Sequence, residues 1–225
     1  MTLPEGLVAC EDGLVRPTWA ATDLLLRDYY DTEWGSPVTS EQGVFERLVL
    51  ESFQSGLSWS TILKKREAFR CAFASFIPEA VAAFTDQDRE RLMQDAGIVR
   101  NKRKIDAAIT NARAVIALRG ALAAEADAHR AGRVGEAPLT HLLRPQQPYP
   151  RHLGELAWLY QPSHQPRPRC AQEVPAQTEE SRALSLELKR RGFVFVGPVT
   201  ALALMSAIGI VNTDILGTWK RPSNE

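Results

Sequence analysis

The chain has 225 residues, of which 44% are hydrophobic and 24% are charged, and its formal net charge at pH 7 is zero. This composition is typical of a folded globular protein and excludes a disordered or fibrous chain. The length is sufficient for one substantial core, so we expect a single domain over residues 1–225. The N-terminus lacks a basic region followed by an apolar run, and no stretch approaches the length of a membrane span. We therefore expect a cytoplasmic protein that does not associate with a membrane.

Helical periodicity recurs along the chain, and patterns typical of strands are sparse, so we predict an all-α fold. Asp86 and Thr178 are candidate helix start signals. The predicted helices cover Val44–Phe53, Thr61–Phe73, Pro78–Phe84, Asp86–Asp95, Lys102–Leu118, Glu180–Arg190 and Pro198–Ile208.

Prolines concentrate in one tract of the chain. Residues 133–175 contain eight of the 14 prolines, which predicts loops around a short helix near Leu153–Tyr160. We interpret residues 120–175 as an elaboration of the core. The four histidines lie in or near this tract without the spacing of a helical metal pair, and the three cysteines are widely scattered. We therefore predict neither a metal site nor a disulfide framework.

Glu51 is the most unusual residue of the predicted helices. On a helix, Val44, Leu48 and Glu51 fall at positions i, i+4 and i+7, so the acid shares a face with core residues. A buried carboxylate is costly unless it is paired, hydrogen-bonded or protonated, and such groups are often kept for function. The alternatives are a different helix phase and an acid that pairs with a core arginine.

The segment from Lys189 to Thr200 has the pattern of two helices joined by a tight hairpin. Gly192 can end the first helix, Phe193 and Phe195 can anchor the connection, and Pro198 suits the first turn of the second helix. Free amides at such a helix N-terminus bind phosphate without regard to base sequence. The alternative is an ordinary helix connection with a glycine stop.

The zero net charge conceals an uneven distribution that also suggests nucleic acid. Residues 1–60 contain 3 of the 27 basic residues and 10 of the 27 acidic ones, so residues 61–225 carry a net charge of +7. A single short basic run is usually a solvated helix face, but three runs beside loop signals favour DNA contact. The three runs are Lys64–Arg66, Arg100–Lys104 and Lys189–Arg191.

Five ordered segments resemble the DNA-3-methyladenine glycosylase I family. Leu50–Glu67 resembles the family signature LExxQAGLSWxTILxKRE, and the resemblance covers most of residues 16–217 apart from a tract near 120–150. The other four segments are Tyr29–Gly35, which resembles YHDxEWG, Gln94–Ile105, which resembles DAGIIRNxxKI, Asn111–Ala114 and Leu188–Gly197.

The resemblance implies a helix-hairpin-helix DNA glycosylase that binds double-stranded DNA as a monomer and flips an alkylated purine into a pocket. It implies that Glu51 accepts hydrogen bonds from the base, that Trp59 stacks on it and that Tyr29 lines the pocket. Leu26 stands where a second pocket tyrosine is usual. Gly56 and Leu57 match a loop that enters the duplex. From residue pattern alone, Leu57 and Trp59 are more often core residues.

The resemblance further implies that hairpin residues bind the DNA backbone, and these are Gly192, Gly197, Thr200, Lys189 and Arg190. No lysine matches a Schiff-base nucleophile. We therefore expect monofunctional hydrolysis that leaves an abasic site, without a metal or organic cofactor. The alternative is a catalytically silent helix-hairpin-helix module that only binds DNA.

The chain departs from the family at its ends. The family commonly ties the two ends together with zinc, but Tyr30, Asp214 and Thr218 stand at three ligand positions, and the fourth falls near Pro17 or Thr18. Tyrosine, aspartate and threonine bind zinc poorly as a set. We therefore expect packing to hold the chain ends instead of a metal.

Overall fold

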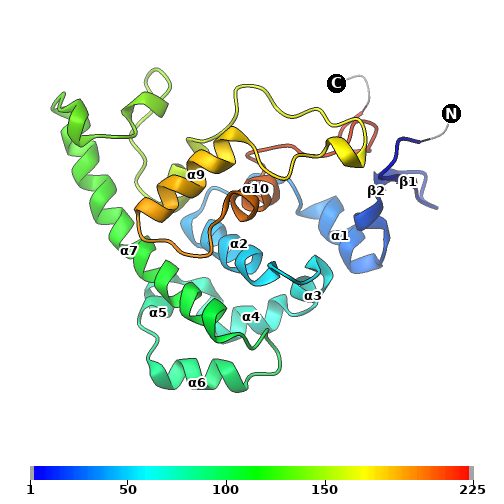
Figure 1. The fold of residues 1–225 in the computed structure, drawn as a ribbon, viewed down its shortest axis with the longest axis horizontal. Coiled ribbons are helices and arrows are strands. Elements are labelled where there is room, and N and C mark those ends of the chain that lie inside the picture. The colour runs from blue at the N-terminus through cyan, green and yellow to red at the C-terminus, as the bar shows by residue number, and fades with distance from the viewer. Residues whose placement is uncertain (1–2, 223–225) are drawn as a thin grey trace.

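The computed structural model describes residues 3–222, which form a helical structure with one small antiparallel sheet (Figure 1). Strands β1 (Leu7–Ala9) and β2 (Val15–Pro17) pair with Leu7 opposite Pro17. The all-α prediction is confirmed. The helices are α1 (Leu24–Thr32), α2 (Glu41–Gln54), α3 (Trp59–Lys64), α4 (Arg66–Ala72), α5 (Pro78–Ala82), α6 (Asp86–Gln94), α7 (Lys102–Arg130), α8 (Leu153–Trp158), α9 (Glu179–Arg190) and α10 (Pro198–Ala207).

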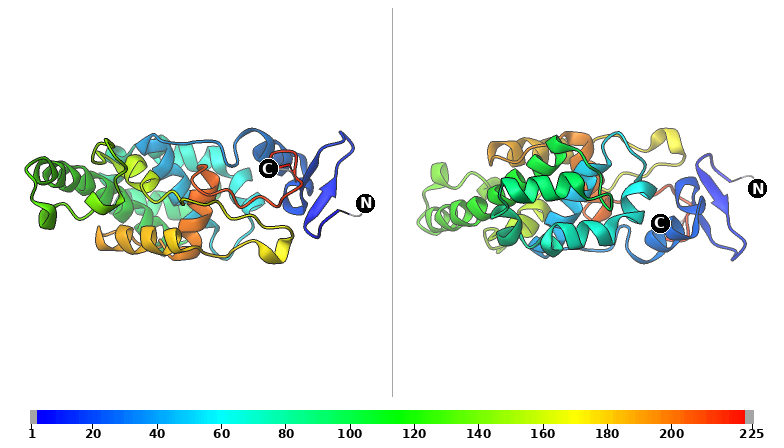
Figure 2. Two further views of the ribbon diagram at one scale, coloured as in Figure 1. Left: turned by 90° about the horizontal axis from the view of Figure 1, so that it is seen from above. Right: turned by 90° about the horizontal axis from the view of Figure 1, so that it is seen from below.

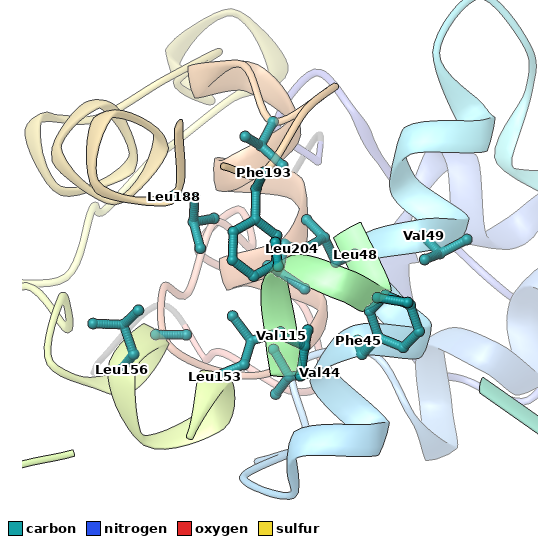
Figure 3. Close-up of a cluster of buried hydrophobic side chains, with 14 of the residues drawn as sticks. Val44, Phe45, Leu48, Val49, Val115, Leu153, Leu156, Leu188, Phe193 and Leu204 are labelled. Atoms are coloured by element: carbon teal, nitrogen blue, oxygen red, sulfur yellow. The ribbon is translucent and has the colours of Figure 1, made fainter. Parts of the chain in front are cut away.

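Helix α2 lies at the centre of the molecule and is the main scaffold of the core (Figures 1 and 3). Ser40 caps its N-terminus by accepting a hydrogen bond from the Gly43 amide. Its apolar side chains pack against α7, α8 and α10. Figure 3 shows Val44 and Leu48 of α2 in one buried cluster with Val115, Leu153 and Leu204. Because α2 is covered on several sides, any polar group on its inner face is removed from water.

Helix α7 is longer than predicted. The periodic pattern predicted an end near Leu118, but the helix continues to Arg130. Gly120 interrupts the pattern without ending the helix, because Leu122 and Ala128 beyond it are buried and Arg119 pairs with Glu41 and Glu79. Residues 120–130 are therefore helical, and the loops, interrupted by short 3₁₀ turns and α8, begin after them.

The expectation that no segment is long enough to cross a membrane is also wrong for α7. By length and composition, α7 could cross a membrane, contrary to the expectation that no stretch approaches that length. Half of its most apolar stretch is buried inside the protein. That burial is the property of a core helix.

The remaining differences from prediction are local. Helix α1 was not predicted, and Asp23 caps it by accepting a hydrogen bond from the Leu26 amide. The helix predicted over Thr61–Phe73 divides at Lys65 into α3 and α4. The Lys65 ammonium donates to the carbonyl groups of Ala96 and Gly97, which ties this break to the loop before α7.

The two chain ends lie at the same end of the molecule (Figure 2). Arg16 on β2 is buried and donates hydrogen bonds to Asp31 on α1 and to Asp12. The Trp219 side chain donates to Asp31, and its backbone amide donates to the Val15 carbonyl group. The N-terminal hairpin, α1 and the C-terminal segment are thus joined directly.

The family's zinc positions form part of this junction. The Asp214 carboxylate accepts hydrogen bonds from Tyr30 Oη (3.1 Å) and Trp34 Nε1 (3.2 Å), and burial raises the Asp214 pKa. Within residues 3–222, no three His, Cys, Asp or Glu side chains are grouped to hold a metal ion. The residues present therefore do not fit a zinc ion, because both carboxylate oxygens already have protein donors.

We predict that the chain ends stay joined without metal. Elemental analysis should find no stoichiometric zinc, and adding chelator should leave the unfolding temperature unchanged. In contrast, Arg16→Met should lower the unfolding temperature by about 5 °C, because it leaves Asp31 partly buried without its main partner. One tightly held equivalent of zinc would contradict this prediction.

Candidate active site and DNA-binding surface

A cavity of about 820 Å³ opens between the central helices and the N-terminal segment. Side chains of α1, α2, α3 and α10 line it, together with residues 171–176 and part of the C-terminal segment. Most of the lining is apolar. Its polar and aromatic members include Glu51, Gln54, Trp59, Trp34, Ser206 and Asp214.

Glu51 lies on the last turns of α2 and faces this cavity. Its side chain shares the buried face with Val44 and Leu48, as predicted, and the residue is only 4% exposed. No hydrogen bond or ion pair among the described residues reaches its carboxyl group, and the nearby Arg47 pairs with Glu33 and Glu46 instead. Burial raises the Glu51 pKa to about 8, which the charge of Arg47 offsets only in part.

Trp59 and Leu26 both line the cavity, as the resemblance implies, but Tyr29 does not. Tyr29 is only 2% exposed, and its ring lies behind Trp59 with 5.4 Å between ring centroids. Burial and the nearby Glu51 raise the pKa of Tyr29. The Tyr29 hydroxyl and Trp59 Nε1 are buried without a hydrogen-bond partner among the described residues. Tyr29 therefore supports the aromatic wall from behind.

The wedge loop, residues 55–58, connects α2 to α3 beside the cavity. Gly56 has a φ of +79°, a conformation that favours glycine, and the Leu57 amide closes the turn on the Gln54 carbonyl. Leu57 is 42% exposed. The structure therefore places Leu57 on the surface and not in the core.

The hairpin, residues 191–197, joins α9 to α10 as predicted. Gly192 has a φ of +87°, and α10 begins at Pro198 without a side-chain cap. The amides of Val199 and Thr200 at this helix start are thus available to a ligand. Phe193 is buried and anchors the hairpin, but Phe195 is 43% exposed and does not, contrary to the prediction.

The three basic runs do not form the uniform cationic surface that their sequence suggests. Lys189 is exposed, and Arg190 is half exposed while it pairs with Glu187. Arg191 is buried between Glu125 and Glu187. In the other runs, Arg66 pairs with Glu33, and the Lys65 and Lys104 ammonium groups bind backbone carbonyls. The exposed cations that remain are Lys64, Arg100, Lys102, Arg103, Lys189 and Arg190.

Sequence reasoning missed two features of the site. Asp214 was considered only as a zinc position, yet it also lines the cavity. Residues 171–176, from the proline-rich tract, form one wall. The sequence gives little indication that this loop lines the cavity, because loops lack the periodicity that indicates which residues are buried. The three cysteines have free thiols, as predicted.

A hairpin between two helices, a buried acid in an apolar cavity and an exposed leucine in the adjoining loop are the features that the family resemblance implies. Residues 19–130 and 143–221 match the model of the methyladenine glycosylase family, and the chain belongs to this family. The internal segment outside the match, residues 131–142, is shorter than the tract near 120–150 expected to depart from the family.

Known relatives span nearly the whole chain. DNA-3-methyladenine glycosylase 1 of Escherichia coli K12 is 38% identical over 92% of this chain and 97% of its own. A crystal structure of a 3-methyladenine DNA glycosylase I has a TM-score of 0.74 and 34% identity, and the alignment covers 91% of this chain and 98% of that one. A Staphylococcus aureus structure that addresses 3-methyladenine recognition has a TM-score of 0.71 and 28% identity, with coverage of 90% and 94%.

The buried Glu51 carboxyl should make stability depend on pH. Its pKa is near 4.5 in an unfolded chain and about 8 in the folded protein, so between these values the folded protein binds one more proton. The free energy of unfolding therefore falls as pH rises in this range, by up to about 1.4 kcal/mol per pH unit. Glu51→Gln removes this dependence. The unfolding temperature of the variant should rise relative to that of the wild type from pH 5 to pH 8. A constant difference between the two unfolding temperatures would contradict the raised pKa of Glu51.

Proposed function

We propose that this protein hydrolyses the N-glycosidic bond of an alkylated purine, 3-methyladenine or a related adduct, after flipping it out of duplex DNA. The observation that carries the proposal is a buried carboxyl group without a protein partner, which faces an apolar cavity beside Trp59. Family membership supports the same reaction.

The chemistry of the lesion explains why such a site suffices. A purine alkylated at N3 is cationic, so its bond to the sugar is already weakened and the enzyme need not protonate the leaving group strongly. A cation that enters the cavity favours the ionised form of Glu51 and lowers its pKa from about 8. The resulting carboxylate accepts hydrogen bonds from the base. Neutral adenine offers no charge to offset the desolvated carboxylate, and this difference selects for the lesion.

The neighbouring side chains have distinct roles in this proposal. Trp59 presents an aromatic face to the cationic ring, which is attracted to its π electrons. Tyr29 holds Trp59 from behind, and Leu26 leaves the cavity wider than a tyrosine would. A carboxylate at Glu51 can also stabilise the positive charge that develops on the sugar or orient the attacking water.

DNA binding in this proposal depends on the wedge loop and the hairpin. Leu57, together with the turn at Gly56, fills the space that the flipped base leaves in the stack. The amides after Gly197, including that of Thr200, bind a phosphate, and Gly192 allows the turn that presents them. Lys189 and Arg190 add charge beside the hairpin.

The reaction ends at an abasic site, because the residues that line the cavity include no lysine that could form a Schiff base. The proposed hydrolysis uses no metal or organic cofactor. The protein acts as a monomer on double-stranded DNA in the cytoplasm. A module that only binds DNA would have no use for a desolvated acid beside an aromatic wall. Incubating the protein with methylated DNA and identifying the released base by chromatography tests the proposal.

We predict that Glu51→Gln lowers base release about 100-fold, because glutamine cannot provide the negative charge that the cationic base requires. Affinity for undamaged duplex should stay within about twofold, since that binding depends on phosphate contacts. Glu90→Gln, an exposed acid on α6, is the control and should retain activity. Full base release by the Glu51 variant would remove this residue from the mechanism.

We also predict that Gly197→Val weakens binding to any duplex about tenfold. A Cβ at this position meets no protein atom within 4 Å, so the fold tolerates it, but the side chain would crowd a phosphate at the adjacent amides. The salt dependence of binding should weaken by about one phosphate contact. Gly135→Val is the matched control, because Gly135 is equally open but lies just beyond the far end of α7. Unchanged affinity across salt concentrations would contradict the hairpin assignment.

A further inference from the structure

Lys104 is a buried lysine whose position is unusual for a cation. It lies in the first turn of α7, where the helix dipole disfavours positive charge, and it is only 8% exposed. Burial lowers its pKa, and the hydrogen bonds of its ammonium group among the described residues go to backbone carbonyls and not to an acidic side chain. An apolar side chain would fill this space at lower cost. The position therefore requires an explanation beyond packing.

The Lys104 ammonium is bound by the end of another helix. Its Nζ donates to the carbonyl oxygen of Phe53 at 2.8 Å and to that of Ser55 at 2.5 Å. These carbonyls belong to the last turn and C-cap of α2, where free carbonyl groups and the dipole favour a cation. The same turn carries Glu51, and the wedge loop with Leu57 follows directly. Lys104 thus fixes the stem of the wedge loop.

Asn111 makes an equivalent contact two turns further along α7. Its side-chain Oδ1 accepts from the Val194 amide at 2.8 Å, and its Nδ2 donates to the Val194 carbonyl at 3.0 Å. Asn111 is only 1% exposed. One side chain therefore pairs with both backbone groups of a hairpin residue whose own side chain is 39% exposed.

The two contacts share one face of one rigid element. Residues i and i+7 lie on the same side of a helix and are separated by about 10 Å along its axis. Ser52 on α2 also donates to the Phe195 carbonyl at 3.3 Å, which joins the α2 end to the hairpin directly. In the proposed function, a duplex contacts the wedge loop and the phosphate-binding amides at the same time. The distance between these two elements therefore affects both contacts.

We propose that α7 fixes the spacing between the wedge loop and the hairpin, with Lys104 and Asn111 as positioning residues that never touch DNA. This inference rests on the proposed function. The basic run that contains Lys104 was expected to contact DNA. The proposal instead assigns the Lys104 ammonium to a contact inside the protein. Neither residue is among those that line the cavity.

The test compares Lys104→Met and Asn111→Leu, which keep side-chain volume but remove the hydrogen bonds. Lys102→Met and Thr110→Leu are matched controls, since both residues are exposed on the same helix. Lys104→Arg and Asn111→Asp are the conservative variants that keep some of the contacts. Each folded variant is assayed well below its own unfolding temperature.

Two binding measurements separate the roles. The first is affinity for undamaged duplex as a function of salt. The second is the fluorescence of 2-aminopurine placed opposite an abasic-site analogue, with protein at saturation, which reports insertion of a side chain into the stack. Neither measurement requires base release.

Asn111→Leu should weaken duplex affinity about tenfold and reduce the salt dependence by about one phosphate contact. Lys104→Met should keep affinity within about twofold and keep the salt dependence, while it loses at least half of the fluorescence change. Lys104→Arg should restore most of that change, and Asn111→Asp should fall between the wild type and Asn111→Leu.

A reduction of the salt dependence by about one phosphate contact in Lys104→Met would overturn the proposal, because it would make Lys104 a phosphate contact. Wild-type behaviour of both folded variants in both measurements would overturn it as well. These outcomes concern α7 alone. A wild-type protein that neither inserts into the stack nor releases an alkylated base would instead refute the proposed function.

Discussion

The burial of the Glu51 carboxyl on α2 is the constraint on which the site depends. Helix α2 is covered by α7, α8 and α10, and the buried Glu51 carboxyl is removed from most water while no hydrogen bond or ion pair among the described residues reaches it. The carboxyl consequently keeps its proton near neutral pH, with its pKa raised to about 8. Its charge then responds to whatever enters the cavity. A cation is the partner that this arrangement favours most, and in the proposed function that cation is the alkylated base.

Much of the positive charge in this protein stabilises the fold and does not face a ligand. Arg191, Arg66 and Lys104 lie in basic runs, yet each is turned toward acidic or carbonyl groups of the protein. Four of the ten cations in the three basic runs are thus turned into the protein, so the proposed DNA binding relies on the backbone amides at the start of α10 as well as on exposed side chains. Amides suit this role because they are held by the helix and recognise phosphate without reading base sequence.

The elements best predicted from sequence were those with strong local signals. The buried face of α2 was predictable from helical periodicity, and the hairpin was predictable from Gly192 and Pro198. The end of α7 was not predictable, because Gly120 breaks the local pattern and the ion pairs of Arg119 that sustain the helix involve distant residues. The orientation of Lys104 was also hidden, since a sequence shows that a charge is present but not where it points. Tyr29 was assigned to the cavity wall by resemblance, whereas tertiary packing places it behind Trp59.

The chain ends are joined by hydrogen bonds at positions where the family resemblance implies zinc ligands. A zinc ion joins segments by bonds of fixed geometry, while here Asp214 accepts hydrogen bonds from Tyr30 and Trp34, and Arg16 bridges β2 to α1. Hydrogen bonds of this kind tolerate small movements that a metal does not. Asp214 also lines the cavity that contains Glu51. The junction of the chain ends therefore shares Asp214 with the wall of this cavity, so substitutions that change the junction also change the shape of the cavity.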